Sequence, residues 1–208
     1  MYASLRAPSN SKAQRVRDYC EDLWRSYSYY AEPQFLAEFP IHFHERWFEM
    51  YLTVSLLHRG AQLQKTLPPG PDLLANVKGR RVWIEAVCGS GGEEGLPDSI
   101  PEPYFSKPGE PVSGGYVPWD RIALRIRSAV EDKRRKLQLY LERGIVTGDD
   151  SLLIAINVHR IPYASSDIER YVFRSLFGVG NQVIVVDRKT AEAAVSYTHL
   201  TLPTKRIV

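Results

Sequence analysis

The sequence predicts an α/β protein with a mixed β-sheet flanked by helices. Segments with helical periodicity alternate with short apolar segments rich in β-branched residues. Two of the strand-like segments are joined by only two residues, which is typical of an antiparallel hairpin. The later strand-like segments are separated by helical ones, which indicates parallel neighbours. With 208 residues, 44% of them hydrophobic, the chain is long enough for one folded core.

The N-terminal part of the chain predicts two helices. Residues 12–32 are rich in Tyr and Trp and end at Glu32-Pro33, so we expect them to form a helical extension that spans 1–42. A second helix is predicted over residues 43–59, whose sequence is FHERWFEMYLTVSLLHR. Its middle is apolar on nearly all sides, which predicts a buried helix.

The rest of the chain predicts two strands, a long loop and then alternating helices and strands. The hairpin strands are expected near residues 72–77 and 80–87, and the Gly- and Pro-rich residues 88–119 form a loop. The elements expected after the loop are a helix over 120–143, a strand over 151–158 that is buried on both faces, a helix over 166–177 and a buried strand over 182–187.

The C-terminal residues 195–208 resemble the translated read-through of a sequencing adapter. We therefore expect the natural sequence to be cut short near Ala194, with its own C-terminus missing, and assign the core domain to residues 43–194. The tail contributes Lys205 and Arg206, and the net charge of +3 is no argument for a nucleic-acid partner.

Composition excludes several classes of protein. No run of eighteen apolar residues is long enough to span a membrane, and no apolar signal-peptide core is present at the start. Cys20 and Cys88 are too few for a disulfide framework, so we expect free thiols in the cytoplasm. The basic segment 121–143 is either a phosphate-facing helix or a solvated helix face.

Two carboxylates are expected to converge on the hairpin. With Lys78-Gly79 as the turn, Leu73 faces Ile84, and Asp72 faces Glu85 on the same face of the sheet. Two such charges about 5 Å apart repel by roughly 3 kcal/mol at an effective dielectric constant of about 20. A divalent cation removes this cost, whereas splayed solvated carboxylates or a protonated pair are the alternatives.

Two further charges fall on apolar surfaces of predicted helices. Glu49 stands alone in the apolar helix, so it is either paired with an arginine such as Arg81, or acts as a third metal ligand or as a group that orients metal-bound water. Lys133 falls within the apolar stripe of the helix over 120–143, and Lys136 lies at its border. Lys133 either snorkels or points toward the carboxylates.

A helix with a lone Glu, a Pro-Asp before a strand, and an apolar strand ending in Glu resemble the PD-(D/E)XK nuclease superfamily. The residues that carry the resemblance are Trp47-Phe48-Glu49-Met50-Tyr51-Leu52, Gly70-Pro71-Asp72 and Trp83-Ile84-Glu85-Ala86-Val87. The resemblance implies a restriction-endonuclease-like sandwich and hydrolysis of DNA phosphodiesters with Mg²⁺ or Mn²⁺. It also implies that Asp72 and Glu85 bind the metal and that Glu49 assists.

The sequence departs from the superfamily pattern at one position, because Val87 stands where the motif has its lysine. Some members of the superfamily supply this lysine from the following helix, which makes Lys133 the candidate, with Lys136 as second choice. The alternatives are a degenerate domain of this fold that binds nucleic acid or protein without cleavage, and an unrelated α/β interaction domain.

Overall fold

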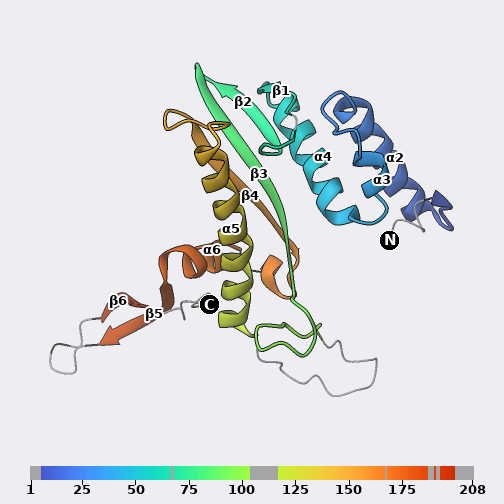
Figure 1. The fold of residues 1–208 in the computed structure, drawn as a ribbon. Coiled ribbons are helices and arrows are strands. Elements are labelled where there is room, and N and C mark those ends of the chain that lie inside the picture. Colours follow the sequence, from blue (N-terminus) through green and yellow to red (C-terminus); the bar gives the residue numbers. More distant parts are fainter. Residues whose placement is uncertain are drawn as a thin grey trace. The chain divides into compact units, whose positions relative to one another are not determined.

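The structure is a computed structural model that describes residues 6–66, 68–103, 117–166, 168–186, 190 and 193–199 (Figure 1). Its helices and strands follow in this order: α2 (Ser11–Tyr27), α3 (Phe35–Glu38), α4 (Phe43–His58), β1 (Gln62–Gln64), β2 (Leu73–Val77), β3 (Arg80–Ser90), α5 (Trp119–Glu142), β4 (Ser151–Arg160), the 3-10 helix η1 (Ala164–Ser166), α6 (Ile168–Phe177), β5 (Val179–Val186) and β6 (Ala193–His199).

The main sheet has four strands in the order β1-β2-β3-β4, and helices flank it. β1, β2 and β3 are antiparallel neighbours, and the complete sheet is mixed. The predicted α/β class with a mixed sheet and flanking helices is therefore confirmed. β1 was missed by the sequence analysis because three residues are too short for a periodic pattern to be recognised.

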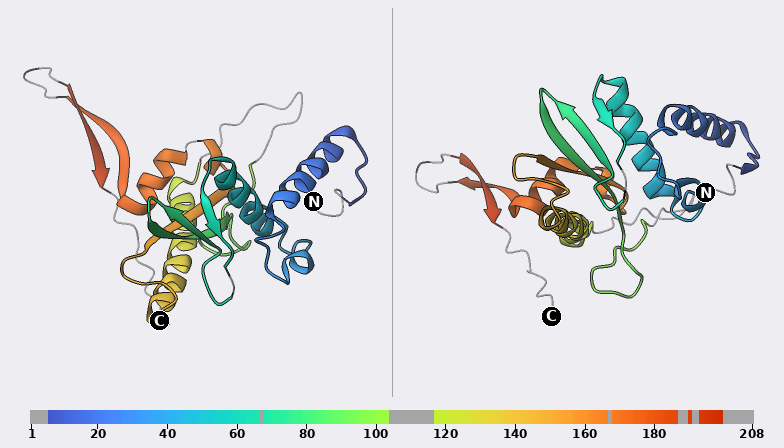
Figure 2. Two further views of the ribbon diagram at one scale, coloured as in Figure 1. Left: turned by 90° about the horizontal axis from the view of Figure 1, so that it is seen from above. Right: turned by 45° about the horizontal axis from the view of Figure 1, so that its top comes forward.

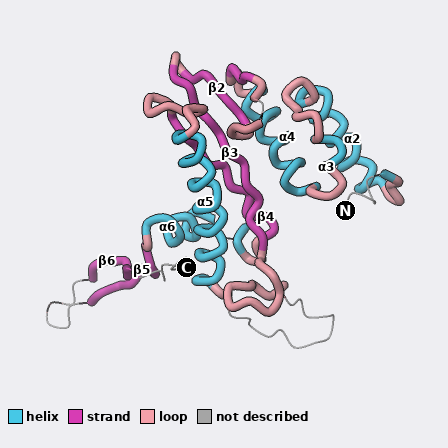
Figure 3. Tube along the Cα trace, in the orientation of Figure 1, coloured by secondary structure: helices cyan, strands magenta, loops and turns pink. Residues whose placement is uncertain are grey.

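The hairpin has the predicted register. Leu73 pairs with Ile84 and Val77 with Arg80. Lys78 and Gly79 both have positive φ angles, 53° and 80°, as the two central residues of a type I′ turn require. β3 continues past its pairing with β2 and ends at Ser90, three residues beyond the predicted end of the strand (Figure 3).

The two faces of the hairpin pack against different helices. Leu73, Ala75 and Ile84 form one cluster, to which Leu52 and Leu56 of α4 contribute. Leu74 and Trp83 point to the opposite face, where they pack with Val146 and with Tyr140 and Leu141 of α5. The alternation of side chains along each strand produces this division. Carboxylates at positions 72 and 85 belong to the face that α5 covers.

The chain divides into two compact units. The first consists of Met1–Cys88 and Val130–Asn157, and the second of Gly89–Ala129 and Val158–Val208. Within the first unit, α2 packs on α4 through a buried cluster that includes Leu23, Tyr27, Phe35, Met50 and Val54 (Figure 2). In the second unit, Trp119 stacks on Tyr171 with ring centroids 5.1 Å apart.

Three sequence predictions about elements are wrong. The first helix ends at Tyr27 instead of residue 32, because Ser28–Tyr30 form a turn in which the amide of Tyr30 bonds the carbonyl of Tyr27. β4 is an edge strand of the sheet and is not buried on both faces, since Leu152 and Leu153 are 39% and 47% exposed. β5 does not join the main sheet but pairs antiparallel with β6.

The other predicted elements have the following outcomes. The helices over 43–59 and 120–143 are confirmed as α4 and α5, and that over 166–177 corresponds to η1 followed by α6. Part of the predicted loop, residues 104–116, lies outside the described residues. β6 crosses the predicted start of the tail at residue 195, and residues 200–208 are also outside the described part of the chain.

Candidate active site

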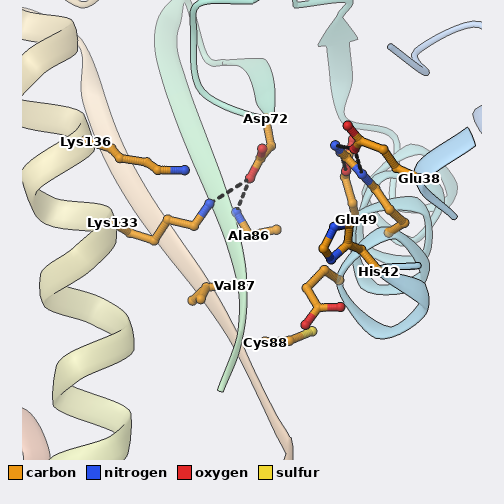
Figure 4. Close-up of a pocket in the computed structure, with 11 residues that line it drawn as sticks. Glu38, His42, Glu49, Asp72, Ala86, Val87, Cys88, Lys133 and Lys136 are labelled. Atoms are coloured by element: carbon orange, nitrogen blue, oxygen red, sulfur yellow. Dashed lines mark hydrogen bonds and ion pairs between the residues drawn. The ribbon is translucent and has the colours of Figure 1, made fainter. Parts of the chain in front are cut away.

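A pocket of about 350 Å³ lies in the first unit, next to the position where β2 begins and β3 continues (Figure 4). Its walls come from the end of α3, the start of α4, the residue before β2, the middle of β3 and one turn of α5. The lining residues are Glu38, His42, Glu45, Arg46, Glu49, Asp72, Ala86, Val87, Cys88, Lys133 and Lys136. The pocket therefore brings together Glu49, Asp72 and Lys133, three of the four predicted site residues.

Asp72 ends the pairing between the two hairpin strands. The residue precedes β2, and its Oδ2 accepts the backbone N–H of Ala86 at 2.7 Å. A side-chain oxygen thus bonds a strand amide just beyond the last backbone pair, Leu73 with Ile84. This bond fixes the carboxylate at the pocket wall, beside the strand that carries Glu85.

Lys133 joins the two carboxylates of the hairpin. Its Nζ donates a hydrogen bond to Oε2 of Glu85 and lies 3.5 Å from Oδ2 of Asp72. The side chain of Lys133 is 14% exposed and that of Glu85 is 1% exposed, so the ion pair is shielded from solvent. The prediction that Lys133 points toward the carboxylates is confirmed, and a snorkelling lysine is excluded.

Burial and the neighbouring charges shift the protonation equilibria of Lys133 and Glu85. Burial by itself lowers the pKa of Lys133, but Asp72 and Glu85 outweigh it and raise the pKa of this ammonium. Burial and then the charge of Asp72 raise the pKa of Glu85, against the lowering effect of Lys133. Burial and the neighbouring Glu85 raise the pKa of Tyr140, which keeps this phenol protonated. Lys133 is consequently a cation and hydrogen-bond donor at neutral pH.

Glu49 is held by a separate set of partners on α2 and α4. Its carboxylate accepts hydrogen bonds from the Tyr27 hydroxyl and from Nη1 of Arg46, the latter at 2.7 Å. The same arginine bonds Glu38 through Nε at 2.9 Å. Burial raises the pKa of Glu49, and the charge of Asp72 adds to this effect. The ion-pair alternative for Glu49 thus holds with Arg46 and not with Arg81, which pairs with Asp150 at 3.3 Å.

Glu49 does not complete a ligand set with the hairpin carboxylates. Asp72 and Glu85 share the face covered by α5, whereas α4 packs on the opposite face of the hairpin. Among the described residues, no group of three or more His, Cys, Asp or Glu side chains is placed to hold a metal ion. The hairpin therefore offers two carboxylates to a cation, with Glu49 on another wall of the pocket.

Arg46 in the pocket lining, and two tyrosines that lie next to its carboxylates, were not assigned to the site from the sequence. Arg46 precedes Glu49 by one helical turn, and that spacing was a usable signal. Tyr27 and Tyr140 come from distant segments, and no local pattern links them to the carboxylates. On α5, Arg125 bonds the Ser90 carbonyl at 2.9 Å, so the predicted basic helix is not uniformly a phosphate-facing surface.

No protein-family model, curated protein or solved structure matches the chain. Within the described part of the chain, none of the helices is both long and apolar enough to cross a lipid bilayer. The arguments for a function come from the pocket itself, from its charges and from the elements that position them.

Proposed function

We propose that this chain is a metal-dependent nuclease with a restriction-endonuclease-like core that hydrolyses phosphodiester bonds in DNA. The observation that carries the proposal is the contact of one ammonium, Lys133, with two carboxylates: that of Asp72, which precedes β2 and lines the pocket, and that of Glu85 on β3. Position 87 is a valine, and in this proposal Lys133 of α5 takes the place of the motif lysine, as the following helix does in some members of the superfamily. An ion pair with a purely structural role has no need of a pocket beside it.

The donor chemistry of the pocket fits Mg²⁺ or Mn²⁺. Both cations bind carboxylate oxygens, and Mg²⁺ commonly uses one or two carboxylates, with waters and substrate phosphate as the remaining ligands. Asp72, which lines the pocket, and Glu85, which is buried against Lys133, would hold the ion, and Glu49 lines the same pocket. When bound, such an ion lowers the pKa of a coordinated water and neutralises charge on the phosphate.

The residues of the chain have separate roles in this proposal. Lys133 holds both carboxylates through its ammonium and thereby positions them, and its positive charge favours the attacking water beside them. Asp72 is oriented by the amide of Ala86, which reduces its freedom before substrate binds. Glu49 is oriented by Tyr27 and Arg46 in the same way.

A second candidate function is a degenerate domain of the same fold that binds nucleic acid without cleaving it. The observation that favours it is the ammonium of Lys133 itself, which already compensates the charges of Asp72 and Glu85 in the absence of metal. A relic that had lost its metal would keep the two strands stable in this manner.

The deciding experiment is plasmid cleavage with Mg²⁺ or Mn²⁺, together with binding of the same plasmid. Wild type is compared with Asp72→Asn and Glu85→Gln, which preserve side-chain shape, and with Asp149→Asn, which changes an exposed carboxylate outside the pocket. We expect cleavage by wild type and Asp149→Asn and at least a hundredfold loss in the other two, as for removal of a major electrostatic contribution.

The other outcomes separate the candidate functions. Equal cleavage by all four proteins would show that the carboxylate pair is not the site. DNA binding without cleavage by wild type favours the degenerate domain. A wild-type protein that neither binds nor cleaves DNA contradicts both candidates.

A further inference from the structure

The cations of the pocket differ in whether they already have partners. The Lys and Arg side chains in its lining are Arg46, Lys133 and Lys136. Arg46 is paired with Glu38 and Glu49, and Lys133 with Asp72 and Glu85. Binding of an anionic ligand by either residue competes with these ion pairs, so each is a poor primary contact for phosphate.

Lys136 is the exception. It lies one helical turn after Lys133 on α5, and residues at this spacing have neighbouring side chains. In Figure 4 the two lysines extend side by side, and the ammonium of Lys136 points toward the wall that carries Asp72. Among the described residues no carboxylate forms an ion pair with Lys136, and its side chain is exposed.

The surroundings of Lys136 make it the natural anion contact. Four carboxylates line the pocket, namely Glu38, Glu45, Glu49 and Asp72, so a phosphodiester entering it meets repulsion that a cation must offset. Lys136 lines the same pocket as Asp72, one helical turn from the lysine that contacts both carboxylates of the hairpin. A phosphate bound to it would therefore stand next to the carboxylate pair.

We infer that Lys136 binds the phosphate of the nucleic-acid substrate beside the carboxylate pair, whereas Lys133 positions the carboxylates. This assignment rests on the proposed function and gives the two neighbouring lysines different roles. An ammonium binds phosphate as a point charge, so Arg at this position retains binding, whereas Gln does not.

The test is binding of a short fluorescein-labelled DNA duplex in Ca²⁺, measured by fluorescence anisotropy at several salt concentrations. We compare Lys136→Gln and Lys136→Arg with Lys12→Gln, which removes the same charge from an exposed position on α2 outside the pocket. For Lys136→Gln we expect a dissociation constant about tenfold larger and a salt dependence whose slope is smaller by about one. Lys136→Arg and Lys12→Gln should both retain the wild-type slope.

The outcomes are separable from those of the function itself. If Lys136→Gln binds the duplex with the affinity and salt dependence of the wild type, the assignment of Lys136 is wrong and the nuclease proposal is unaffected. An equal loss in Lys12→Gln also overturns it, since the effect would then be one of net charge. If Asp72→Asn binds like wild type but does not cleave, binding by Lys136 and chemistry at the hairpin are distinct. A wild-type protein without affinity for the duplex overturns both proposals.

Discussion

The ammonium of Lys133 contacts the carboxylate of Glu85, a residue 48 positions earlier in the chain, where both side chains are largely removed from solvent. A buried charge that loses its partner is costly, by about 3–5 kcal/mol, because its desolvation is no longer compensated. The pair is thus a sensitive probe of both the fold and the proposed chemistry.

The first prediction concerns the stability of this pair. We expect Lys133→Met to lower the free energy of unfolding by about 3 kcal/mol, because Glu85 is left buried beside Asp72. Glu85→Gln should lower the free energy of unfolding by less, because the ammonium of Lys133 still has the carboxylate of Asp72 as a partner at 3.5 Å. Urea unfolding of both variants and of the double variant measures the interaction energy between the two side chains. The stability lost by the double variant should be smaller than the sum of the losses in the single variants. Additive losses would mean that the two groups do not interact.

The second prediction concerns metal affinity, and it depends on the proposed function. Removal of the ammonium in Lys133→Met leaves two carboxylates without a compensating cation, so we expect Mn²⁺ to bind about tenfold more tightly than to wild type. Isothermal titration calorimetry measures the affinity, and Mn²⁺ should restore part of the lost stability. Lys12→Met serves as the control. Unchanged or weaker Mn²⁺ binding in Lys133→Met would place the metal elsewhere.

The third prediction concerns alkaline pH. Burial and the negative charge of Glu49 raise the pKa of Tyr27 above its ordinary value of 10.0. The folded chain therefore keeps a proton that the unfolded chain loses above about pH 10, and stability falls as pH rises through that range. Tyr27→Phe should be less stable at neutral pH but lose about 1 kcal/mol less between about pH 10 and pH 11.

Urea unfolding at several pH values tests this prediction. Tyr29→Phe is the matched control, because the same hydroxyl is removed from a side chain that is 70% exposed. It should follow the wild-type dependence. If the free energy of unfolding of Tyr27→Phe also decreases with pH as steeply as that of the wild type, the hydroxyl of Tyr27 is not buried against Glu49 in solution.

The fourth prediction concerns β4. Leu153 is 47% exposed, so we expect Leu153→Thr to change the free energy of unfolding by less than about 1 kcal/mol. Ile84→Ala, in the buried cluster under α4, should cost about 2–5 kcal/mol in the same experiment. A comparable loss at both positions would mean that another surface covers β4.

Local patterns predicted much of the hairpin and of its carboxylates. The Lys78-Gly79 turn and strict alternation determine which side chains share a face, and the observed register follows from them. The helical phase of Lys133 was also informative, because α5 packs on the face that carries Glu85. These inferences needed only the period of each element and one turn.

The remaining features depend on long-range packing. Glu49 lines the same pocket as Asp72, but it is bonded by Tyr27 and Arg46, and no periodicity within α4 carries that information. The apolar run in β4 predicted burial on both faces, yet the strand lies at an edge of the sheet. Likewise β5 has the composition of a central strand but pairs with β6. Which partner a strand acquires is decided by contacts distant in sequence.

The bond between Asp72 and the amide of Ala86 has a consequence for how this pocket can change over generations. The carboxylate of Asp72 both ends the pairing of β2 with β3 and lines the pocket, so one residue affects both the fold and the chemistry of the pocket. A substitution that extended the ladder by another backbone pair would close the opening, and one that removed the acceptor would fray the hairpin. Mutational drift at this position is accordingly constrained twice, by folding and by whatever the pocket binds.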